Sequence, residues 1–521
     1  MTMRRPSLAL TGTILVLTLA MGTGNARAQT ATDETRDLPE TLPTGTDAPR
    51  NPNDAEGTTG RTWTIEPRIR GSETMTDNVR LTTKDREADF ITSISPGIRI
   101  EGKTRRLEAS LDAEITYDRY VNTPGLNGHY YTVAGLANAE LWEEHGYVDV
   151  RSSVNTQKIS RTGAESATNR TQPSNQTQVF NNSVSPYLRQ NFGTWADSEV
   201  RYRLSTTNFQ SVTDETDTQP DDTLTNEFSF LLRSGPTFTS LQWSADASVS
   251  RTDYPDDRKI DEGTATLATE YALSRQIGLI AKVGYDSFDD SASAAPAERN
   301  PSWRLGTHLT PGPRTDFTVE GGERYGGTYY AGSLDYKFSD ALRLTAKHDS
   351  QVTTQQRAVG NALTNATGTA TDTTTGSAAQ ANDSEFDYTS QAYTTTTTSV
   401  TLSGERGRTS LDVNAEHEKR EYGATGLDQT GDRTRDVYSL SVNVGRELTP
   451  LSEFAVRLGV SLSEEDGGTG DSVTARTGAT YSYRLSESLT GSVSYDHYDR
   501  RNDVGTGYRE NVVFVGLSKT F

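Results

Sequence analysis

Cysteine is absent from this chain of 521 residues. Its absence excludes a disulfide framework, a thiolate metal site and a lipid-anchored cysteine after an export signal. Apolar residues are scarce at 32%, and after the first 28 residues no run approaches the about 20 apolar residues that a membrane-spanning helix needs. Positive charge is in the minority, with 51 lysines and arginines against 71 aspartates and glutamates and a net charge of −20. That balance excludes nucleic acid as a partner, because nucleic-acid binding needs a basic surface.

The first 28 residues have the layout of a secretory signal peptide. Arg4 and Arg5 precede an apolar run from Leu8 to Met21, and Ala26-Arg27-Ala28 supplies the small residues of a cleavage site. An uncleaved anchor helix is the alternative, although the run is short for one. Residues 29–60 follow without a repeating apolar position. We expect them to form a disordered periplasmic leader that is too short for a folded plug domain.

From residue 61 to residue 521 apolar and polar residues alternate, which predicts half-buried β-strands. Leu107, Leu111 and Tyr117 fall on one face of such a segment, and acidic residues fall on the other. We expect about 22 strands, with 20 to 24 compatible with the pattern, and an even number is typical of single-chain bacterial barrels. The expected ranges are 61–74, 89–101, 104–120, 129–142, 146–157, 177–191, 195–209, 224–236, 238–253, 261–273, 276–288, 299–310, 314–324, 327–338, 340–353, 389–404, 407–421, 434–447, 452–463, 471–485, 487–499 and 508–521.

The connections between these expected strands alternate between tight and long. Long polar loops, expected to be extracellular, include 158–176, 210–223, 354–388 and 422–433, whereas Gly326-Gly327 is short where a long loop is expected. Short turns on one side and long loops on the other are typical of outer-membrane barrels. A closed barrel has no sheet edge, and lipid covers its apolar exterior. The sequence therefore predicts an all-β, antiparallel, up-and-down transmembrane barrel in the bacterial outer membrane.

Aromatic residues near the expected strand ends predict a girdle at each membrane interface. Tyr271, Tyr336 and Tyr483 each precede a tight turn, and we place them in the periplasmic girdle. The outer girdle is expected to contain Tyr117, Tyr120, Tyr285, Phe288, Tyr495 and Tyr498. The alternative is that these positions reflect only the preference of aromatic side chains for strands.

The last expected strand ends on a phenylalanine. Val513, Val515, Leu517 and Phe521 alternate along Tyr508–Phe521, in a pattern that resembles the signal by which the assembly machinery recognises outer-membrane barrels. Lys519 departs from that pattern, since an apolar residue is common at its position, but a lysine near the interface can extend its amine to water. The implied partners are the β-barrel assembly machinery, outer-membrane lipid and lipopolysaccharide.

Four stretches resemble a known family. Trp63–Leu81, Asp89–Gly102, Ser250–Arg258 and the ending Tyr508–Phe521 are similar to the β-barrel porin 2 family and to outer-membrane proteins associated with the PEP-CTERM system. The resemblance implies an outer-membrane barrel that is linked with exopolysaccharide export, with export components as partners and without catalytic residues. The segment 355–388 has no counterpart in the resemblance and is interpreted as a local insertion.

The sequence contains little that could support catalysis. Its six histidines stand at spacings that fit no metal site, so we expect no enzymatic activity, no metal and no cofactor. The polar faces of the strands are expected to line a lumen instead, with charged candidates at Glu108, Asp112, Glu114, Asp118, Arg151 and Asp286. The alternative is that these groups only hydrate the wall.

Three functions remain compatible with such a barrel. The first is a pore for small solutes, in which inward loops, above all 354–388, narrow the lumen and net acidity favours cations or neutral sugars. The second is an exit or accessory for exopolysaccharide, which rests on the family resemblance. The third is a non-conducting barrel with a surface-structural or adhesive role.

Overall fold

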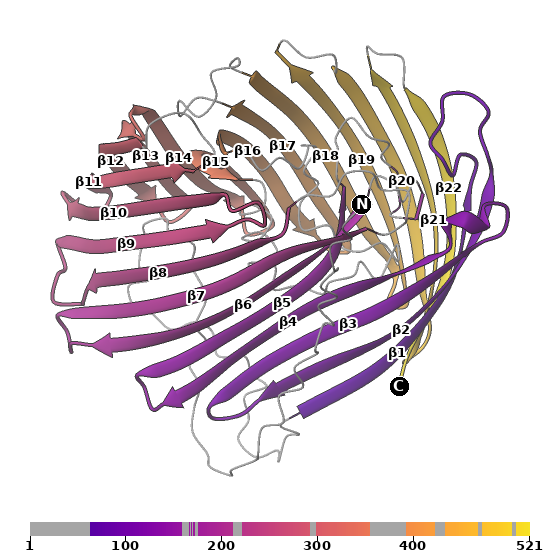
Figure 1. Ribbon diagram of the computed structural model, residues 1–521, viewed down its shortest axis with the longest axis horizontal. Helices are drawn as coiled ribbons and strands as arrows, with labels where there is room; N and C mark the ends of the chain where they lie inside the picture. Colours follow the sequence, from indigo (N-terminus) through magenta and orange to yellow (C-terminus); the bar gives the residue numbers. More distant parts are fainter. Residues whose placement is uncertain are drawn as a thin grey trace, which may run out of the picture.

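The chain folds into one antiparallel sheet of 22 strands that closes on itself, as Figure 1 shows. The structure, a computed structural model, describes residues 63–158, 166, 168, 170–171, 176–211, 221–291, 298–354, 392–422, 433–466, 471–502 and 507–521. The predicted signal peptide (1–28), the predicted leader (29–60) and most of the loops 158–176, 210–223, 354–388 and 422–433 lie outside these residues. The predicted all-β barrel and its strand number are confirmed.

The strands agree closely with the alternation in the sequence, and one short 3-10 helix interrupts them. Their bounds are β1 (Trp63–Thr76), β2 (Asp89–Lys103), β3 (Leu107–Tyr120), η1 (Pro124–Leu126), β4 (Gly128–Trp142), β5 (Gly146–Lys158), β6 (Gln176–Asn191), β7 (Ala196–Ser211), β8 (Thr223–Ser234), β9 (Leu241–Asp253), β10 (Lys259–Ala272), β11 (Ile277–Asp290), β12 (Glu298–Gly312), β13 (Thr315–Arg324), β14 (Gly327–Ser339), β15 (Leu342–Thr354), β16 (Ala392–Arg406), β17 (Thr409–Tyr422), β18 (Arg433–Thr449), β19 (Ser452–Glu465), β20 (Ser472–Ser486), β21 (Leu489–Asn502) and β22 (Tyr508–Thr520). The described part of the chain contains no helix that is long and apolar enough to cross a membrane.

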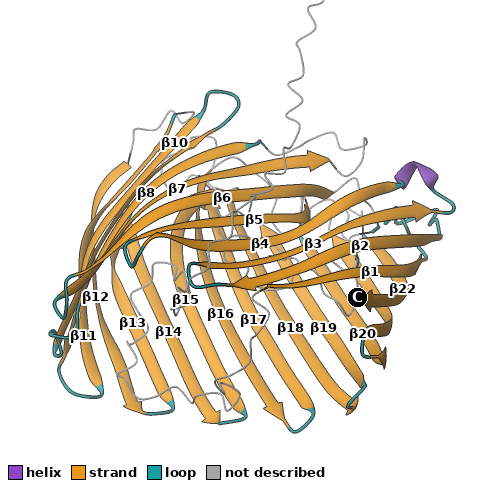
Figure 2. Cartoon of the chain, turned by 90° about the horizontal axis from the view of Figure 1, so that it is seen from below, coloured by secondary structure: helices purple, strands orange, loops and turns teal. Residues whose placement is uncertain are grey.

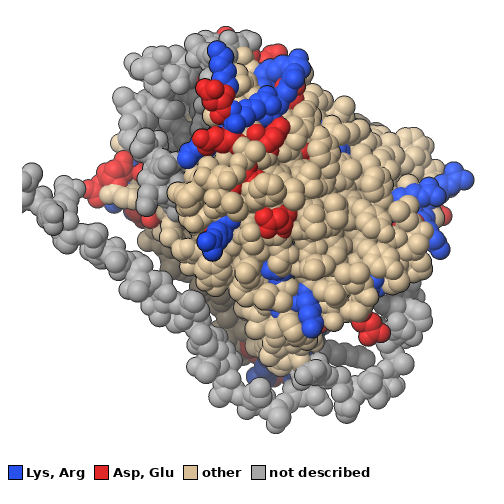
Figure 3. Space-filling view, turned by 90° about the vertical axis from the view of Figure 1, so that its right-hand side faces the viewer, with Lys and Arg blue, Asp and Glu red and all other residues tan. Residues whose placement is uncertain are grey.

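The two faces of each strand carry opposite chemistry. On β3, Asp112 and Glu114 are buried at 7% and 4% exposure, whereas the outward Tyr117 is 54% exposed. Large apolar side chains on the exterior and buried polar ones inside reverse the pattern of a soluble protein. Figure 3 shows one side of the exterior as a broad surface of uncharged residues, with charged side chains gathered mainly toward its edges. Such an exterior is stable when lipid, rather than water, surrounds it.

The barrel has two unlike rims. Strands are joined by turns of a few residues at one rim and by mostly longer connections at the other, and Figure 2 shows strongly slanted strands between them. β1 begins and β22 ends at the short-turn rim. The short link between β13 and β14 has positive φ at both Tyr325 (49°) and Gly326 (75°). Positive φ at both central residues is the geometry of a two-residue type I′ hairpin, which explains the tight link at the long-loop rim.

The first and last strands meet in an antiparallel seam that completes the barrel. The register places Arg68 opposite Thr520 and Thr76 opposite Val512. At the long-loop end, the Asn511 amide donates to Asp77 Oδ1 at 2.7 Å. At the other end, the Phe521 amide donates to the Pro67 carbonyl at 2.9 Å. Both ends of the seam are therefore closed by hydrogen bonds.

Candidate functional site: the inner wall and its cavities

The predicted lumen charges on β3 belong to a compact ion-pair cluster. Arg68 Nη1 donates to Asp112 Oδ2 at 2.8 Å, and Arg70 Nη1 donates to Glu114 Oε1 at 3.3 Å. Arg68 also contacts Glu114 at 3.2 Å. The guanidinium groups come from β1 and the carboxylates from β3, across β2. Sequence analysis named the acids but missed Arg68 and Arg70, because their partners are more than 40 positions away and are brought close only by the register.

The other predicted lumen charges also have partners. Glu108 pairs with Lys103 at 3.2 Å, and Arg151 pairs with Asp149 at 3.1 Å. Asp286 accepts a hydrogen bond from Arg324 at 3.4 Å. All three lie on the inner face of their strands by register. Their role in lining a conducting lumen stays a prediction.

Arg170, from the connection between β5 and β6, fastens that connection to the inner wall at the seam. Its guanidinium lies 3.7 Å from Asp118 on β3, donates to Thr74 on β1 at 3.3 Å and lies 5.6 Å from the centre of the Phe514 ring on β22. Its backbone carbonyl accepts a hydrogen bond from the Tyr120 hydroxyl. Burial acts to lower the pKa of Arg170, but Tyr130 and Asp118 outweigh it and raise that pKa above its usual value. Arg170 is therefore a buried, permanently charged group inside the barrel.

A second residue of the same connection contacts the seam. Ser166 donates to Glu510 Oε2 on β22 at 2.6 Å, and Thr76 on β1 donates to Glu510 Oε1 at 3.0 Å. Glu510 is fully buried. Sequence analysis placed the main inward loop at 354–388, which, apart from Thr354, lies outside the described residues. Ser166 and Arg170 of the predicted loop 158–176 do contact the inner wall.

Aromatic side chains form an inner collar at the long-loop rim. The inward tyrosines and phenylalanines near this rim are almost completely buried, and several stack with arginines: Tyr120, Tyr130, Phe288, Tyr329, Tyr393, Tyr498 and Tyr508. Tyr498 and Tyr508 are stacked with ring centres 5.8 Å apart. The assignment of Tyr120, Phe288 and Tyr498 to the outer lipid-facing girdle is therefore wrong. Each stands three positions from an outward tyrosine, and an odd spacing on a strand places two side chains on opposite faces.

The six other girdle candidates lie on the exterior. Tyr271 and Tyr483, near the short-turn rim, are 50% and 39% exposed, and Tyr336 packs edge-on against Phe338 in the same region. Tyr117, Tyr285 and Tyr495, nearer to the long-loop rim, are 54%, 46% and 46% exposed. The contact of these rings with the membrane interfaces stays a prediction.

Three residues of the predicted assembly signal lie on the outer face of β22, and the fourth, Phe521, directly follows this strand. Val513, Val515, Leu517 and Phe521 are all exposed. The amine of Lys519 lies 4.9 Å from the centre of the Phe521 ring. The departure from the apolar pattern at Lys519 thus places a cation against the terminal ring. Recognition of these residues by an assembly machinery stays a prediction.

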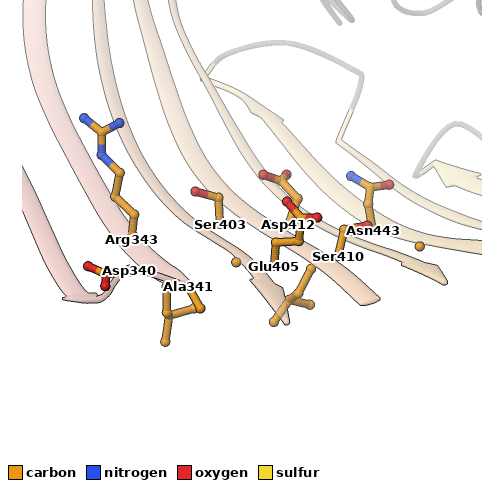
Figure 4. A pocket seen from close by; sticks show the side chains of 12 residues that line it. Asp340, Ala341, Arg343, Ser403, Glu405, Ser410, Asp412 and Asn443 are labelled. Carbon is orange, nitrogen blue, oxygen red and sulfur yellow. The ribbon is translucent and has the colours of Figure 1, made fainter. Parts of the chain in front are cut away.

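The inner wall contains two adjoining cavities. The larger, of about 890 Å³, is lined mainly by β10 to β15, with Ser399 of β16, and includes Lys282, Glu320, Lys337 and Lys347. The smaller, of about 460 Å³, lies at the short-turn rim, and Figure 4 shows Arg343, Ser403, Asp412 and Asn443 projecting to the same side of its wall. Arg343 lines both cavities, which are therefore neighbours. The described residues contain no group of three or more histidine, aspartate or glutamate side chains that could hold a metal ion.

Comparison with known proteins identifies the architecture. No protein-family model matches the sequence, and no curated protein matches it. Among solved structures, the FrpB iron transporter of Neisseria meningitidis in its apoprotein form matches with a TM-score of 0.52 and 9% identity, over 88% of this chain and 81% of that one. The siderophore receptor PirA of Acinetobacter baumannii matches with a TM-score of 0.48 and 8% identity, over 87% and 80%. The likeness to the FrpB transporter shows the fold, a 22-stranded barrel of the kind found in outer-membrane transporters.

Proposed function

We propose that this chain is an outer-membrane pore for small hydrophilic solutes. The observation that carries the proposal is the chemistry of the two faces of the closed sheet, apolar outside and polar inside. An apolar exterior suits lipid, and a polar interior suits a hydrated path. The proposal includes the finer expectations of location and partners: the bacterial outer membrane, lipopolysaccharide, and the β-barrel assembly machinery acting on the last strand. It assigns transport and no catalysis.

The path is best placed along the wall formed by β16 to β18. Inward side chains there are small hydroxyls, amides and acids that are only half-buried, such as Ser399, Thr401, Asn414, Glu416 and Ser441. The β1 to β3 wall is instead filled by buried ion pairs and by Arg170. Short, incompletely covered polar side chains leave room for water and solute, whereas a paired and buried cluster does not.

Conductance tests this proposal directly. Purified, folded protein in planar bilayers is expected to give discrete current steps in KCl, with K⁺ preferred over Cl⁻ because Asp412, Glu416 and Glu418 lie on the open wall. The same sample after heat unfolding serves as the control. Folded protein that carries no current would refute the pore and leave the non-conducting structural barrel.

Export of exopolysaccharide ranks second, and with it membership of the β-barrel porin 2 family. Both rest on the four stretches of sequence that resemble this family. A path for a polysaccharide would be supported by accessible aromatic rings along the lumen, but Tyr393 and Tyr498 on the inner collar are 1% and 0% exposed. Loss of secreted polysaccharide after gene deletion, with normal uptake of small solutes, would favour export over the pore.

A further inference from the structure

The larger cavity gathers lysines in a chain that is acidic overall. Lys282, Lys337 and Lys347 line it from β11, β14 and β15. By register, the only other lysine on the inner face of the described strands is Lys103. Arg304 and Arg343 line the same cavity. This part of the wall is therefore the main concentration of inward lysines in the described barrel, within a chain of net charge −20.

Without a bound ligand, the arrangement of these cations destabilises the fold. Lys337 lies directly opposite Arg343 on the neighbouring strand, and like charges in directly opposite positions destabilise a sheet. Asp335 pairs with Arg343, but the described residues provide Lys337 with no ion-pair partner. Lys337 and Lys347 are both exposed to the cavity. A ligand that brings negative charge would relieve the repulsion.

The cavity also contains a carboxylate, that of Glu320, with one oxygen that lacks a hydrogen-bond donor within the described part of the chain. Glu320 is 8% exposed and lines the cavity. Its Oε1 accepts from Lys282 at 2.7 Å, but its Oε2 is buried and has no hydrogen-bond partner among the described residues. An unpaired buried carboxylate oxygen is unfavourable unless a donor reaches it. Thr318, Ser333 and Thr345 add hydroxyl groups to the same lining.

We propose that the cavity of β10 to β15 binds an acidic oligosaccharide, whose carboxylates meet Lys337, Arg343 and Lys347 and one of whose hydroxyls donates to Glu320 Oε2. A compact anion without hydroxyl donors, such as sulfate, would pair with the cations but could not donate a hydrogen bond to Glu320 Oε2. A neutral sugar would bring no negative charge to Lys337. The cavity volume of about 890 Å³ lies within the usual range for small-molecule sites. This inference rests on the proposed pore and adds to it a solute-binding cavity beside the path along β16 to β18.

Direct binding and current block test the site separately. Trigalacturonate is expected to bind the folded barrel in equilibrium dialysis and to block its current, whereas maltotriose, a neutral trisaccharide, does neither. In the variant Lys337→Gln/Lys347→Gln the dissociation constant of trigalacturonate is expected to rise about tenfold, and raised salt is expected to weaken wild-type binding. Both lysines are exposed, so the variant is expected to fold.

The control is Lys259→Gln, which removes a lysine from the outer face of β10 and leaves the cavity untouched. Its binding is expected to equal that of the wild type. Current that trigalacturonate does not change, together with no binding in dialysis, would overturn the site and leave the pore standing. Binding without any conductance would refute the pore and retain the site. Equal binding of trigalacturonate and maltotriose would also overturn the site. So would an effect of Lys259→Gln on binding as large as that of the double variant.

Discussion

Replacing Arg170 with methionine is expected to lower the free energy of unfolding by about 3–5 kcal/mol, the usual cost of removing one partner of a buried ion pair. The substitution leaves Asp118, which is 7% exposed, without its guanidinium partner in a region shielded from water. It also removes the contacts with Thr74 on β1 and Phe514 on β22, so the loss falls on the strands that close the barrel. The change in the free energy of unfolding is measured by unfolding the protein with urea in lipid vesicles. The folded fraction at each urea concentration is read from heat-modifiable migration on a gel.

A double-mutant cycle separates the ion pair from the general loss of packing. The variant Arg170→Met/Asp118→Leu removes both charges and is expected to recover much of the stability that Arg170→Met loses. The pair Arg80–Glu87 provides a matched control, because its atoms lie 3.1 Å apart but its side chains are 41% and 54% exposed. Arg80→Met is expected to cost at most about 1 kcal/mol. Equal losses in the free energy of unfolding for Arg170→Met and Arg80→Met would contradict the stabilisation of the seam by Arg170.

The variant Leu440→Arg is expected to give a much lower yield of assembled barrel than the wild type. The variant Ser441→Arg is expected to give the same yield as the wild type. Leu440 is 43% exposed on the outer face of β18, and Ser441 follows it on the inner face. An arginine near the bilayer midplane on the lipid face costs about 2–4 kcal/mol. At Ser441 the new guanidinium meets the polar, acidic wall beside Asn414 and Glu416.

The two positions are neighbours at nearly the same depth, so the pair compares only the two faces. The measurement is the amount of heat-modifiable protein in isolated outer membranes, normalised to total synthesis. Equal yields of the two variants, or a larger loss for Ser441→Arg, would contradict the assignment of faces.

Strand positions could be predicted from the sequence because lipid and lumen impose the same period of two on every strand. The range expected at 104–120 became β3 at Leu107–Tyr120, and that expected at 452–463 became β19 at Ser452–Glu465. The same period also assigns each side chain to one of the two faces. Tyr117 and Tyr120 cannot share a face, so the inward position of Tyr120 was readable from spacing alone.

The contacts inside the barrel could not be predicted in the same way. Arg170 reaches Thr74, Asp118 and Phe514, which are distant from it and from one another along the chain. Its connection has no periodicity that would place it against the wall. The cavity lysines are equally scattered, and only the register of β11 to β15 brings Lys282, Lys337 and Lys347 to one site. The alternation of apolar and polar residues predicts which face of the sheet a residue occupies. The register and the closure of the sheet determine which side chains it contacts on that face.

Thiol accessibility along β18 tests the central claim most directly, because the chain has no native cysteine to interfere. Single cysteines at Ser439, Leu440, Ser441, Val442, Asn443 and Val444 are exposed to a hydrophilic, membrane-impermeant thiol reagent in isolated outer-membrane fragments. We expect labelling at 439, 441 and 443 and protection at 440, 442 and 444, with all six sites reactive after unfolding. Uniform labelling, or labelling of the even positions alone, would contradict a closed barrel with lipid outside and water within.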